Sequence, residues 1–255
     1  MPQNDIPVIK LSGKALENKA ALKALFSAVK DKKVIFVHGG GVEVDALLKQ
    51  LNLKTEKIDG IRVSPPEQMP YITAALAGLC NRYLQADAKA CGLNALGLIA
   101  TDGDSVTLSA FDKKFGNVAT ALPANGKFIS LLLENKITPF IASIGIDENG
   151  NVYNINADDV ALAIARVFNA PLFFISDVKG VKDADGNIIE SLAEDTALEL
   201  ISKKVITDGM IVKVKTALDA AKLTHRPVFI ASLNDPDLIS NLFTLRRIGT
   251  SFSVR

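Results

Sequence analysis

The sequence predicts an α/β fold in which a mainly parallel β-sheet carries helices on both of its faces. Short apolar runs, typical of strands buried in a sheet, alternate along the chain with longer segments of helical periodicity. Such alternation is the pattern of parallel strands joined by crossover helices. No Pro-, Gly- or Ser-rich linker interrupts the 255 residues, so one domain is expected, with an N-terminal lobe (residues 1–155) and a C-terminal lobe (residues 156–255).

The N-terminal lobe is expected to contain sheet strands, helices and hairpins. Apolar runs predict strands at residues 6–11, 34–37, 94–99 and 137–143. Helical periodicity predicts helices at residues 19–30, 42–51, 68–90 and 126–135. Turn sequences predict hairpins that pair residues 54–58 with 61–63 and 105–110 with 116–121, and a third over residues 146–153. The first turns at Asp59-Gly60, a favoured two-residue hairpin sequence.

The C-terminal lobe is expected to begin with a helix whose first turn is acidic. Asn156 is a favourable N-cap, and Asp158 and Asp159 suit the positive end of the helix dipole. The apolar run at residues 172–176 predicts a strand buried on both faces. The remaining pattern predicts helices at residues 194–203 and 209–223 and strands at residues 228–231 and 248–254, the last at an edge of the sheet.

The composition argues against several classes of function. Basic and acidic residues balance at 29 against 28, which does not suit a nucleic-acid-binding surface. No apolar run reaches the roughly 18 residues of a membrane span, and residues 1–7 lack the features of a signal peptide. Cys80 and Cys91 suggest neither a disulfide framework nor a metal site. A cytoplasmic protein that acts on small molecules is therefore expected.

Two turns that join a strand to a helix are rich in glycine. The first predicted strand contains Lys10 and runs into Ser12-Gly13, and the second runs into His38-Gly39-Gly40-Gly41. Glycine lets a backbone approach a ligand closely, and a helix N-terminus offers unpaired N–H groups and positive potential. Together with the Lys10 ammonium, these turns predict a pocket for a transferring phosphoryl group.

Each of these features also has an explanation without a ligand. A tight strand-to-helix turn alone accounts for the glycines, and Lys10 can extend its ammonium to water from a sheet edge. Lys213 suits a solvated helix face, and Asp158 suits a first helical turn whether or not it orients a lysine. His38 is expected to be packed or hydrogen-bonded rather than to act as a base. The dinucleotide fingerprint and the P-loop pattern are both missing from the sequence.

Seven motifs in a fixed order carry a resemblance to a known family. They are KLSG at residues 10–13, HGGG at 38–41, GIRVSP at 60–65, DGDS at 102–105, NINAD at 154–158, SDVKGV at 176–181 and ITDGMIVK at 206–213. On these motifs the chain resembles the amino-acid kinase family, and within it the acetylglutamate kinases, along nearly its whole length. Ser12 replaces the usual glycine, in a string that also resembles uridylate kinase, and Ser64 replaces the usual threonine.

The resemblance implies an open three-layer αβα sandwich whose mainly parallel sheet has roughly eight strands. It also implies that the N-terminal lobe binds an acylated amino acid and forms a dimer, while the C-terminal lobe binds ATP. Lys10 and Lys213 would stabilise the charge on the phosphoryl group, and Asp158 would hold both lysines in place. The backbone N–H groups of Gly13 and Gly40 would donate to that group.

The resemblance assigns further residues to the two ligands. The amino-acid substrate would be bound by Gly40, Gly41, Arg62 and Asn154, with Arg62 on its α-carboxylate. The nucleotide would be bound by Lys10, Ser12, Gly13, Asp177, Val178, Lys179, Gly180, Val181, Gly209, Met210 and Lys213.

The implied reaction is ATP-dependent phosphorylation of the γ-carboxylate of N-acetyl-L-glutamate, the second step of arginine biosynthesis. The candidate site holds cations and N–H donors but no convincing general base. A carboxylate acceptor needs none, because its pKa of about 4.3 leaves it ionised at neutral pH. Mg²⁺ is expected to be held by the ATP phosphates and by water, with no metal site made by the protein.

Other functions stay open at this point. The acceptor could be N-succinyl-L-glutamate or another N-acyl amino acid such as N-acetyl-aminoadipate, or it could be uridylate or carbamate. A non-catalytic regulator that binds a nucleotide or an amino acid is a further alternative, and an NAD-dependent oxidoreductase is disfavoured by the missing fingerprint. Few residues precede the first predicted strand, so the added N-terminal helix that accompanies arginine-inhibited hexamers in the family is not expected. A homodimer without arginine inhibition is predicted.

Overall fold

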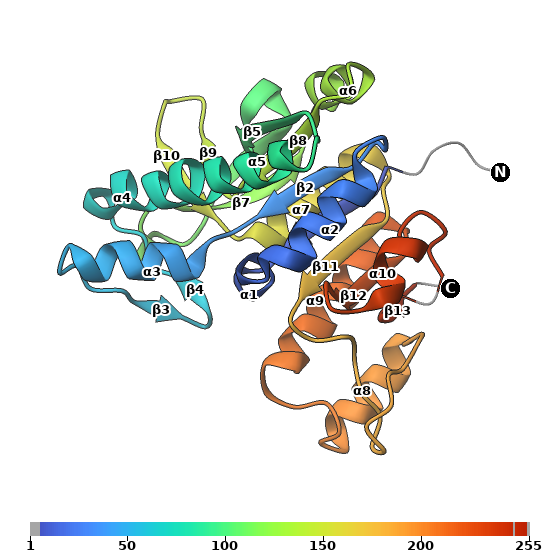
Figure 1. The fold of residues 1–255 in the computed structure, drawn as a ribbon. Coiled ribbons are helices and arrows are strands. Elements are labelled where there is room, and N and C mark those ends of the chain that lie inside the picture. Colours follow the sequence, from blue (N-terminus) through green and yellow to red (C-terminus); the bar gives the residue numbers. More distant parts are fainter. Residues whose placement is uncertain (1–5, 247, 254–255) are drawn as a thin grey trace.

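Seven strands form the central sheet of the computed structural model, which describes residues 6–246 and 248–253 (Figure 1). Their order from edge to edge is β13-β12-β11-β1-β2-β8-β5. All neighbours are parallel except β13, which runs antiparallel to β12. The strands are β1 (Val8–Leu11), β2 (Ile35–His38), β5 (Ala95–Ile99), β8 (Thr138–Ala142), β11 (Leu172–Ser176), β12 (Val228–Ser232) and β13 (Thr250–Phe252). The predicted α/β class with a mainly parallel sheet is thus confirmed.

Helices cover both faces of this sheet, which is why its strands are mainly apolar. One buried cluster joins the sheet to α1 (Gly13–Glu17), α2 (Lys19–Val29), α5 (Asn81–Ala90) and α10 (Pro236–Asn241). The other joins it to α6 (Lys127–Glu134), α7 (Ala157–Phe168), α8 (Glu194–Ser202) and α9 (Asp208–Thr224). The three-layer αβα arrangement follows from these two clusters (Figure 1).

Aromatic side chains fill the first of these two interfaces. Phe36 and Phe140 are register partners on β2 and β8, and their rings stack with centroids 4.7 Å apart. Phe173 and Phe229 pair in the same way on β11 and β12, also at 4.7 Å. Phe26 of α2 packs edge-on against the Phe36 ring. Large apolar side chains in register therefore fix how the helix layer lies on the sheet.

The predicted hairpins lie outside the central sheet. Strands β3 (Lys57–Ile58) and β4 (Ile61–Arg62) pair around Asp59 and Gly60, which both have positive φ as a tight hairpin turn requires. Strands β6 (Val106–Ala110) and β7 (Val118–Pro123) form a second hairpin, and β9 (Ile144–Ile146) with β10 (Val152–Ile155) forms a third. β10 also pairs with β7, which joins the last two hairpins into a four-stranded sheet.

The expected long helix at residues 68–90 is present but is not α-helical throughout. It consists of α4 (Met69–Thr73), a π-helical segment η2 (Ala74–Cys80) and α5, and it packs beside α3 (Gly41–Gln50). A π-turn inserts residues into the helical repeat and so changes which side chains face inward. Asn81, directly after η2, is fully buried. The hydrophobic period of the sequence predicts the helix but does not reveal this change of phase.

Three details differ from the predictions. The described residues form a central sheet of seven strands rather than about eight, because the other strands pair among themselves. The predicted last strand is shorter, and Val254 lies outside the described residues. The sequence prediction missed α1, α10 and the short 3₁₀ turns η1 (Pro66–Gln68), η3 (Asp102–Asp104) and η4 (Lys113–Phe115). No helix among the described residues is both long enough and apolar enough to cross a bilayer.

The strand order sets where a ligand can bind. β1 lies in the middle, with β2 on one side and β11 on the other, so the chain leaves β1 in one direction and later returns to its opposite side. Open α/β sheets bind ligands at such a switch point, outside the carboxyl ends of the strands. The two glycine turns and the segment after β11 all lie at that edge.

Candidate functional site

The two glycine turns lie next to each other and beside the start of α7. Leu11 at the end of β1 is in register with His38 at the end of β2 and with Ile175 on β11. A Cβ added to Gly13 would contact Val42 Cγ2 at 3.6 Å, and one added to Gly39 would contact Ala157 Cβ at 3.5 Å. The fold therefore gathers three segments, of which the start of α7 lies more than a hundred residues after the two turns in the sequence.

Lys10 forms an ion pair at this junction. Its Nζ lies 2.8 Å from Asp158 Oδ1, and the two side chains are only 16% and 29% exposed. Asp158 lies in the first turn of α7, and its backbone N–H donates to the side-chain oxygen of the N-cap Asn156 at 3.0 Å. The structure therefore contains an ion pair between Lys10 and the carboxylate that the resemblance assigned to it.

Lys213 approaches the same junction from α9. Its Nζ donates to Ser176 Oγ at 3.3 Å and lies 3.9 Å from Asp177 Oδ1. A small cavity of about 60 Å³ is lined by Lys10, Ser12, Asp158, Phe174, Ile175, Ser176, Lys213, Thr216 and Ile230. Two ammonium groups and one carboxylate thus surround a space of small volume. The resemblance assigned both lysines to Asp158, whereas the contacts described here pair Asp158 with Lys10, and Lys213 with Ser176 and Asp177.

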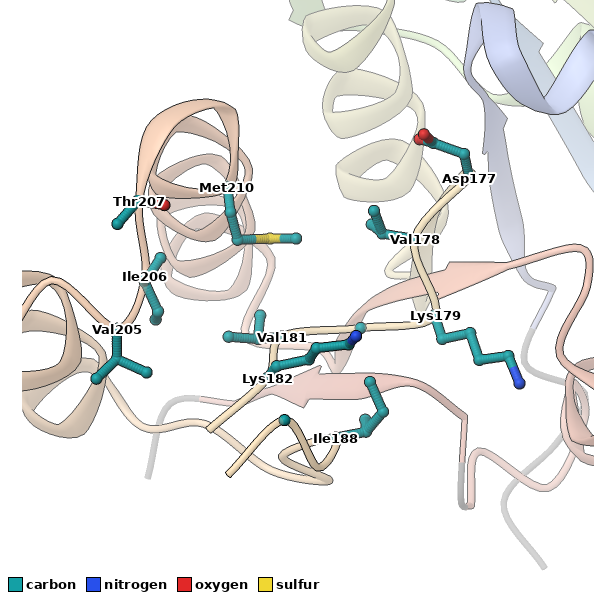
Figure 2. Close-up of a pocket in the computed structure, with 12 residues that line it drawn as sticks. Asp177, Val178, Lys179, Val181, Lys182, Ile188, Val205, Ile206, Thr207 and Met210 are labelled. Carbon is teal, nitrogen blue, oxygen red and sulfur yellow. The ribbon is translucent and has the colours of Figure 1, made fainter. Parts of the chain in front are cut away.

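A larger cavity of about 630 Å³ opens beside Asp177 (Figure 2). Six predicted nucleotide-binding residues line it: Asp177, Val178, Lys179, Gly180, Val181 and Met210. Lys10, Ser12 and Lys213 line the small cavity instead, and Gly209 precedes Met210 in the first turn of α9 without lining either one. The other residues that line the larger cavity are Lys182, Gly186, Ile188, Val205, Ile206 and Thr207. Of these, Ile206 and Thr207 lie in the motif at residues 206–213.

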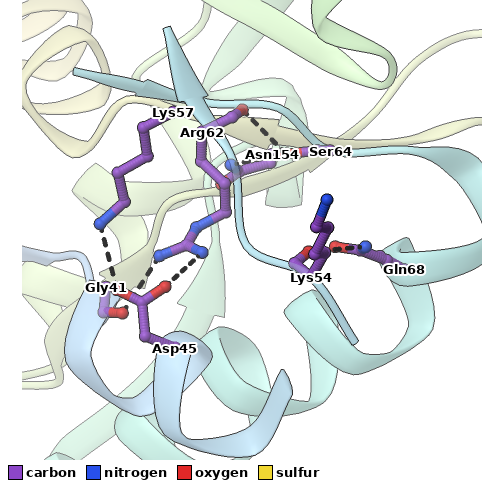
Figure 3. Close-up of polar contacts among 8 residues, drawn as sticks. All are labelled: Gly41, Asp45, Lys54, Lys57, Arg62, Ser64, Gln68 and Asn154. Atoms are coloured by element: carbon purple, nitrogen blue, oxygen red, sulfur yellow. Dashed lines mark hydrogen bonds and ion pairs between the residues drawn. The ribbon is translucent and has the colours of Figure 1, made fainter. Parts of the chain in front are cut away.

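The predicted substrate residues meet near the start of α3 (Figure 3). Arg62 on β4 is 8% exposed, and its Nη2 donates to the carbonyl oxygen of Gly41 at 3.1 Å. Asn154 on β10 donates from Nδ2 to Ser64 Oγ at 3.1 Å. The sequence prediction did not include Asp45, whose Oδ1 accepts from Arg62 Nη1 at 2.6 Å. Gly41, Arg62 and Asn154 come from three elements. The structure brings them together, because Arg62 contacts Gly41 and Asn154 contacts Ser64, two residues after Arg62.

The π-helical segment fixes the second glycine turn from behind. A Cβ added to Gly40 would overlap Cys80 Sγ and would lie 3.0 Å from Leu76 Cδ2. Both Leu76 and Cys80 belong to η2 and are buried. Burial raises the pKa of the Cys80 thiol to about 12, with a smaller contribution from Glu43, so the group stays a neutral packing side chain. Only glycine fits at residue 40 with η2 in this position.

His38 and Asn81 form a buried network under the same turn. Both side chains are fully buried. The Asn81 amide has two hydrogens, and its Nδ2 lies 2.9 Å from His38 Nε2 and 2.8 Å from the carbonyl oxygen of Phe140. Nε2 must therefore accept, and the proton on His38 Nδ1 donates to the Gly39 carbonyl oxygen at 2.7 Å. His38 is a neutral structural donor to the turn, as the sequence predicted, rather than a base.

This network predicts a pH-dependent loss of stability. Burial lowers the pKa of His38 from 6.5 to about 4. The unfolded chain therefore binds a proton before the folded chain does, so stability present above pH 6.5 is lost as the pH falls toward 4. Between pH 7 and 5 this contribution falls by about 2 kcal/mol. Burial also raises the pKa of Asp159 to about 6, which acts in the opposite direction over a similar interval.

Urea unfolding of the wild type and of His38→Asn at pH 7 and pH 5 separates the two groups, because both proteins keep Asp159. The wild type is expected to lose more stability over this interval than the variant. Equal losses would show that His38 does not carry the proton linkage.

The described residues contain no group of three or more His, Cys, Asp or Glu side chains that could hold a metal ion. The polar groups around the small cavity are instead cations and hydroxyls, with the Asp158 carboxylate already paired to Lys10. Such a set suits a multiply charged anion, which a phosphoryl group is.

The comparison with solved structures agrees with this fold. The protein smu.665 from Streptococcus mutans UA159 is 29% identical, with a TM-score of 0.80 over 98% of this chain and 99% of its own. N-acetylglutamate synthase from Neisseria gonorrhoeae, complexed with coenzyme A and N-acetyl-glutamate, is 18% identical with a TM-score of 0.82 over 98% of this chain and 60% of its own. Carbamate kinase from Giardia lamblia, bound to AMP-PNP, is 16% identical with a TM-score of 0.70 over the whole of both chains. The last two establish the fold alone.

The family comparison covers most of the sequence. The model of the amino acid kinase family matches residues 5–232, which include every residue that lines the two cavities described above. Members of this family are phosphotransferases. On this match and on the αβα fold, the chain belongs to the amino acid kinase family.

Proposed function

We propose that this protein phosphorylates the γ-carboxylate of an N-acyl-L-glutamate with ATP, and that N-acetyl-L-glutamate is its substrate. The observation that carries the proposal is the small cavity beside Ser12, which Lys10, Lys213 and Asp158 all line. Asp177 lies next to both cavities, because it lines the larger one and its Oδ1 is 3.9 Å from Nζ of Lys213, which lines the small one. A phosphoryl group bound there would be within reach of both ligands.

The available side chains favour a carboxylate acceptor over an alcohol. A hydroxyl acceptor needs a base to take its proton. Asp158 is engaged by Lys10, and His38 is neutral and buried under the turn with both ring nitrogens hydrogen-bonded. A carboxylate is already an anion, so catalysis consists of positioning and charge stabilisation. Lys10 and Lys213 supply the charge, and the N–H groups of Gly13 and Gly40 supply the donors.

The larger cavity is the proposed ATP site. Its volume of about 630 Å³ lies within the range of small-molecule sites. Apolar side chains such as Val178, Ile188 and Met210 offer surface to a base, while Lys182 offers charge to phosphates (Figure 2). Mg²⁺ would accompany the nucleotide, held by phosphate oxygens and water, as suits an ion that keeps several waters.

The amino-acid substrate is proposed to bind between α3 and the hairpin β3–β4. Arg62 would take its α-carboxylate in a bidentate contact, and Gly41 and Asn154 would make further contacts with the substrate. The γ-carboxylate would then point toward the glycine turns. In the cell this activity would serve the second step of arginine biosynthesis, in the cytoplasm, by a homodimer formed through the N-terminal lobe.

Acceptor-dependent ADP release tests this proposal. The protein would be incubated with ATP and Mg²⁺ and, separately, with N-acetyl-L-glutamate, N-succinyl-L-glutamate, N-acetyl-L-aminoadipate, carbamate and UMP. Release with the N-acyl-glutamates is expected, and the ratio of kcat/KM values identifies the acyl group. Release only with UMP or carbamate would overturn the substrate assignment, and ATP binding without release in any arm would indicate a regulator.

The Arg62→Lys variant tests the proposed carboxylate contact. An ammonium is a single point charge and cannot reproduce the two parallel hydrogen bonds of a guanidinium. The KM for the amino acid is expected to rise by roughly tenfold or more, with a smaller change in kcat and an unchanged KM for ATP. Steady-state kinetics with each substrate varied in turn measures this split. An unchanged amino-acid KM would remove Arg62 from the substrate site.

A further inference from the structure

The arginine assigned to the substrate already has an anionic partner. Arg62 Nη1 donates to Asp45 Oδ1 at 2.6 Å, while Lys57 Nζ donates to the other carboxylate oxygen, Asp45 Oδ2, at 3.1 Å (Figure 3). Asp45 lies on α3, and both cations lie on the hairpin β3–β4. One carboxylate thus joins the hairpin to the helix whose first residue, Gly41, lies at the candidate substrate site.

The contacts differ in burial. Arg62 is 8% exposed, whereas the side chains of Asp45 and Lys57 are 38% and 45% exposed. A charged side chain as buried as Arg62 needs a partner of opposite charge. Burial by itself would raise the pKa of Asp45, but hydrogen bonds from Arg62 and Lys57 and their charges lower it overall. Asp45 is therefore an anion across the neutral range and a lasting counter-ion for Arg62.

The geometry leaves donors for a ligand. A guanidinium carries five N–H bonds, and the contacts of the described residues use one on Nη1 and one on Nη2. The acceptors are Asp45 and Gly41, which lie four residues apart on one face of α3. The guanidinium is thereby fixed at two points across the first turn of this helix, with its Nε–H and one hydrogen on each terminal nitrogen remaining.

We propose that Asp45 is a positioning residue for substrate binding: it holds the Arg62 guanidinium in the orientation that receives the substrate carboxylate. This rests on the proposed function, because it assumes that Arg62 binds a carboxylate. Lys57 shares the same anion but, among the contacts of the described residues, makes none with Arg62, so it tethers the hairpin rather than orienting the guanidinium. A guanidinium that is already held in this orientation loses little further rotamer freedom when it binds a carboxylate.

The consequence is a selective loss of amino-acid affinity when Asp45 changes. Asp45→Asn keeps the shape and one acceptor oxygen but removes the charge. Its KM for the amino acid is expected to rise about tenfold, as for the loss of one charge-assisted hydrogen bond. The KM for ATP is expected to stay unchanged and kcat to change by less than about threefold. A normal or lowered amino-acid KM would overturn the proposal. If Asp45 only competed with the substrate carboxylate for Arg62, the loss of its charge would strengthen substrate binding.

Two further variants separate positioning from general stability. Asp87→Asn is the matched control, because Asp87 is also a partly exposed aspartate in an ion pair, with Lys19 Nζ at 2.8 Å. It is expected to leave both KM values unchanged. Lys57→Met removes the other partner of Asp45 and is expected to change the amino-acid KM by less than about twofold. A rise as large as that of Asp45→Asn would contradict the proposal, because the hairpin tether would then be the cause.

A readout without substrate keeps this proposal distinct from the proposed function. The Arg62 Nε–H signal in ¹⁵N NMR spectra, assigned by its loss in Arg62→Lys, is expected to be sharp and slow to exchange in the wild type and Asp87→Asn. It is expected to broaden or exchange rapidly in Asp45→Asn. If the signal broadens in Asp45→Asn but the protein phosphorylates no N-acyl-glutamate, Asp45 still positions Arg62 and only the proposed function is wrong. An unchanged signal in Asp45→Asn would overturn the positioning role even in an active kinase.

Discussion

Replacing Lys10 with alanine is expected to lower kcat about 10³-fold, the effect of removing one pre-organised donor from a developing charge. Lys10 is 16% exposed and fixed 2.8 Å from Asp158, so its ammonium acts in a poorly solvated space. The affinity for ATP is expected to change far less, because the larger cavity does not include Lys10. Single-turnover kinetics together with nucleotide binding separates the two quantities.

The control for Lys10→Ala addresses the carboxylate that it leaves behind. Asp158 without its partner could repel the nucleotide phosphates, so the double variant Lys10→Ala/Asp158→Asn removes that charge as well. The double variant is expected to remain inactive if the ammonium itself stabilises the transition state. Recovery of turnover in the double variant, or a kcat close to that of the wild type in the single variant, would remove Lys10 from catalysis.

Replacing Gly97 with alanine is expected to destabilise the protein by about 3 kcal/mol or more, since it combines overpacking with broken buried hydrogen bonds. Gly97 lies on β5, and a Cβ there would overlap Asn81 Oδ1. Asn81 cannot move away without losing its bonds to His38 and to the Phe140 carbonyl oxygen. Chemical denaturation of the wild type and the variant measures the difference in the free energy of unfolding.

Gly78→Ala is the matched control for this change. Gly78 lies in the π-helical segment, close in sequence to Asn81, and an added Cβ there has no atom within 4 Å apart from its own helix backbone. The same substitution is therefore expected to be neutral or to stabilise by up to about 1 kcal/mol, through the higher helix propensity of alanine. Equal effects of the two substitutions would show that the contact with Asn81 does not set the cost at Gly97.

The fold could be predicted from the sequence because its signals are local. Apolar runs, helical periods and Asp59-Gly60 each report the conformation of their own segment, and the structure places a strand, a helix or a hairpin at each of them. The strand count could not be obtained in this way. Whether a strand such as β10 joins the central sheet or a separate one depends on pairing between distant segments.

The same distinction between local and long-range signals applies to the residues of the candidate site. Lys10, Asp158 and Arg62 were found because each lies within a short motif, and the structure brings their segments together. Asp45 was missed because its partner Arg62 is seventeen residues away on another element, and α3 reads as an ordinary amphipathic helix. The need for glycine at residue 40, set by Cys80, and at residue 97, set by Asn81, likewise cannot be predicted from the sequence, because it arises from packing between distant segments.

Trapping the product with hydroxylamine tests the central claim most directly. An acyl phosphate reacts with hydroxylamine to give a hydroxamate, whereas a phosphate ester does not, so the assay reports which group accepts the phosphoryl. With ATP, Mg²⁺ and either N-acetyl- or N-succinyl-L-glutamate, the wild type is expected to form hydroxamate at a rate that depends on both substrates, and Lys10→Ala is expected to form almost none. ADP release without hydroxamate, or no turnover with either N-acyl-glutamate, would contradict a carboxylate kinase of this specificity.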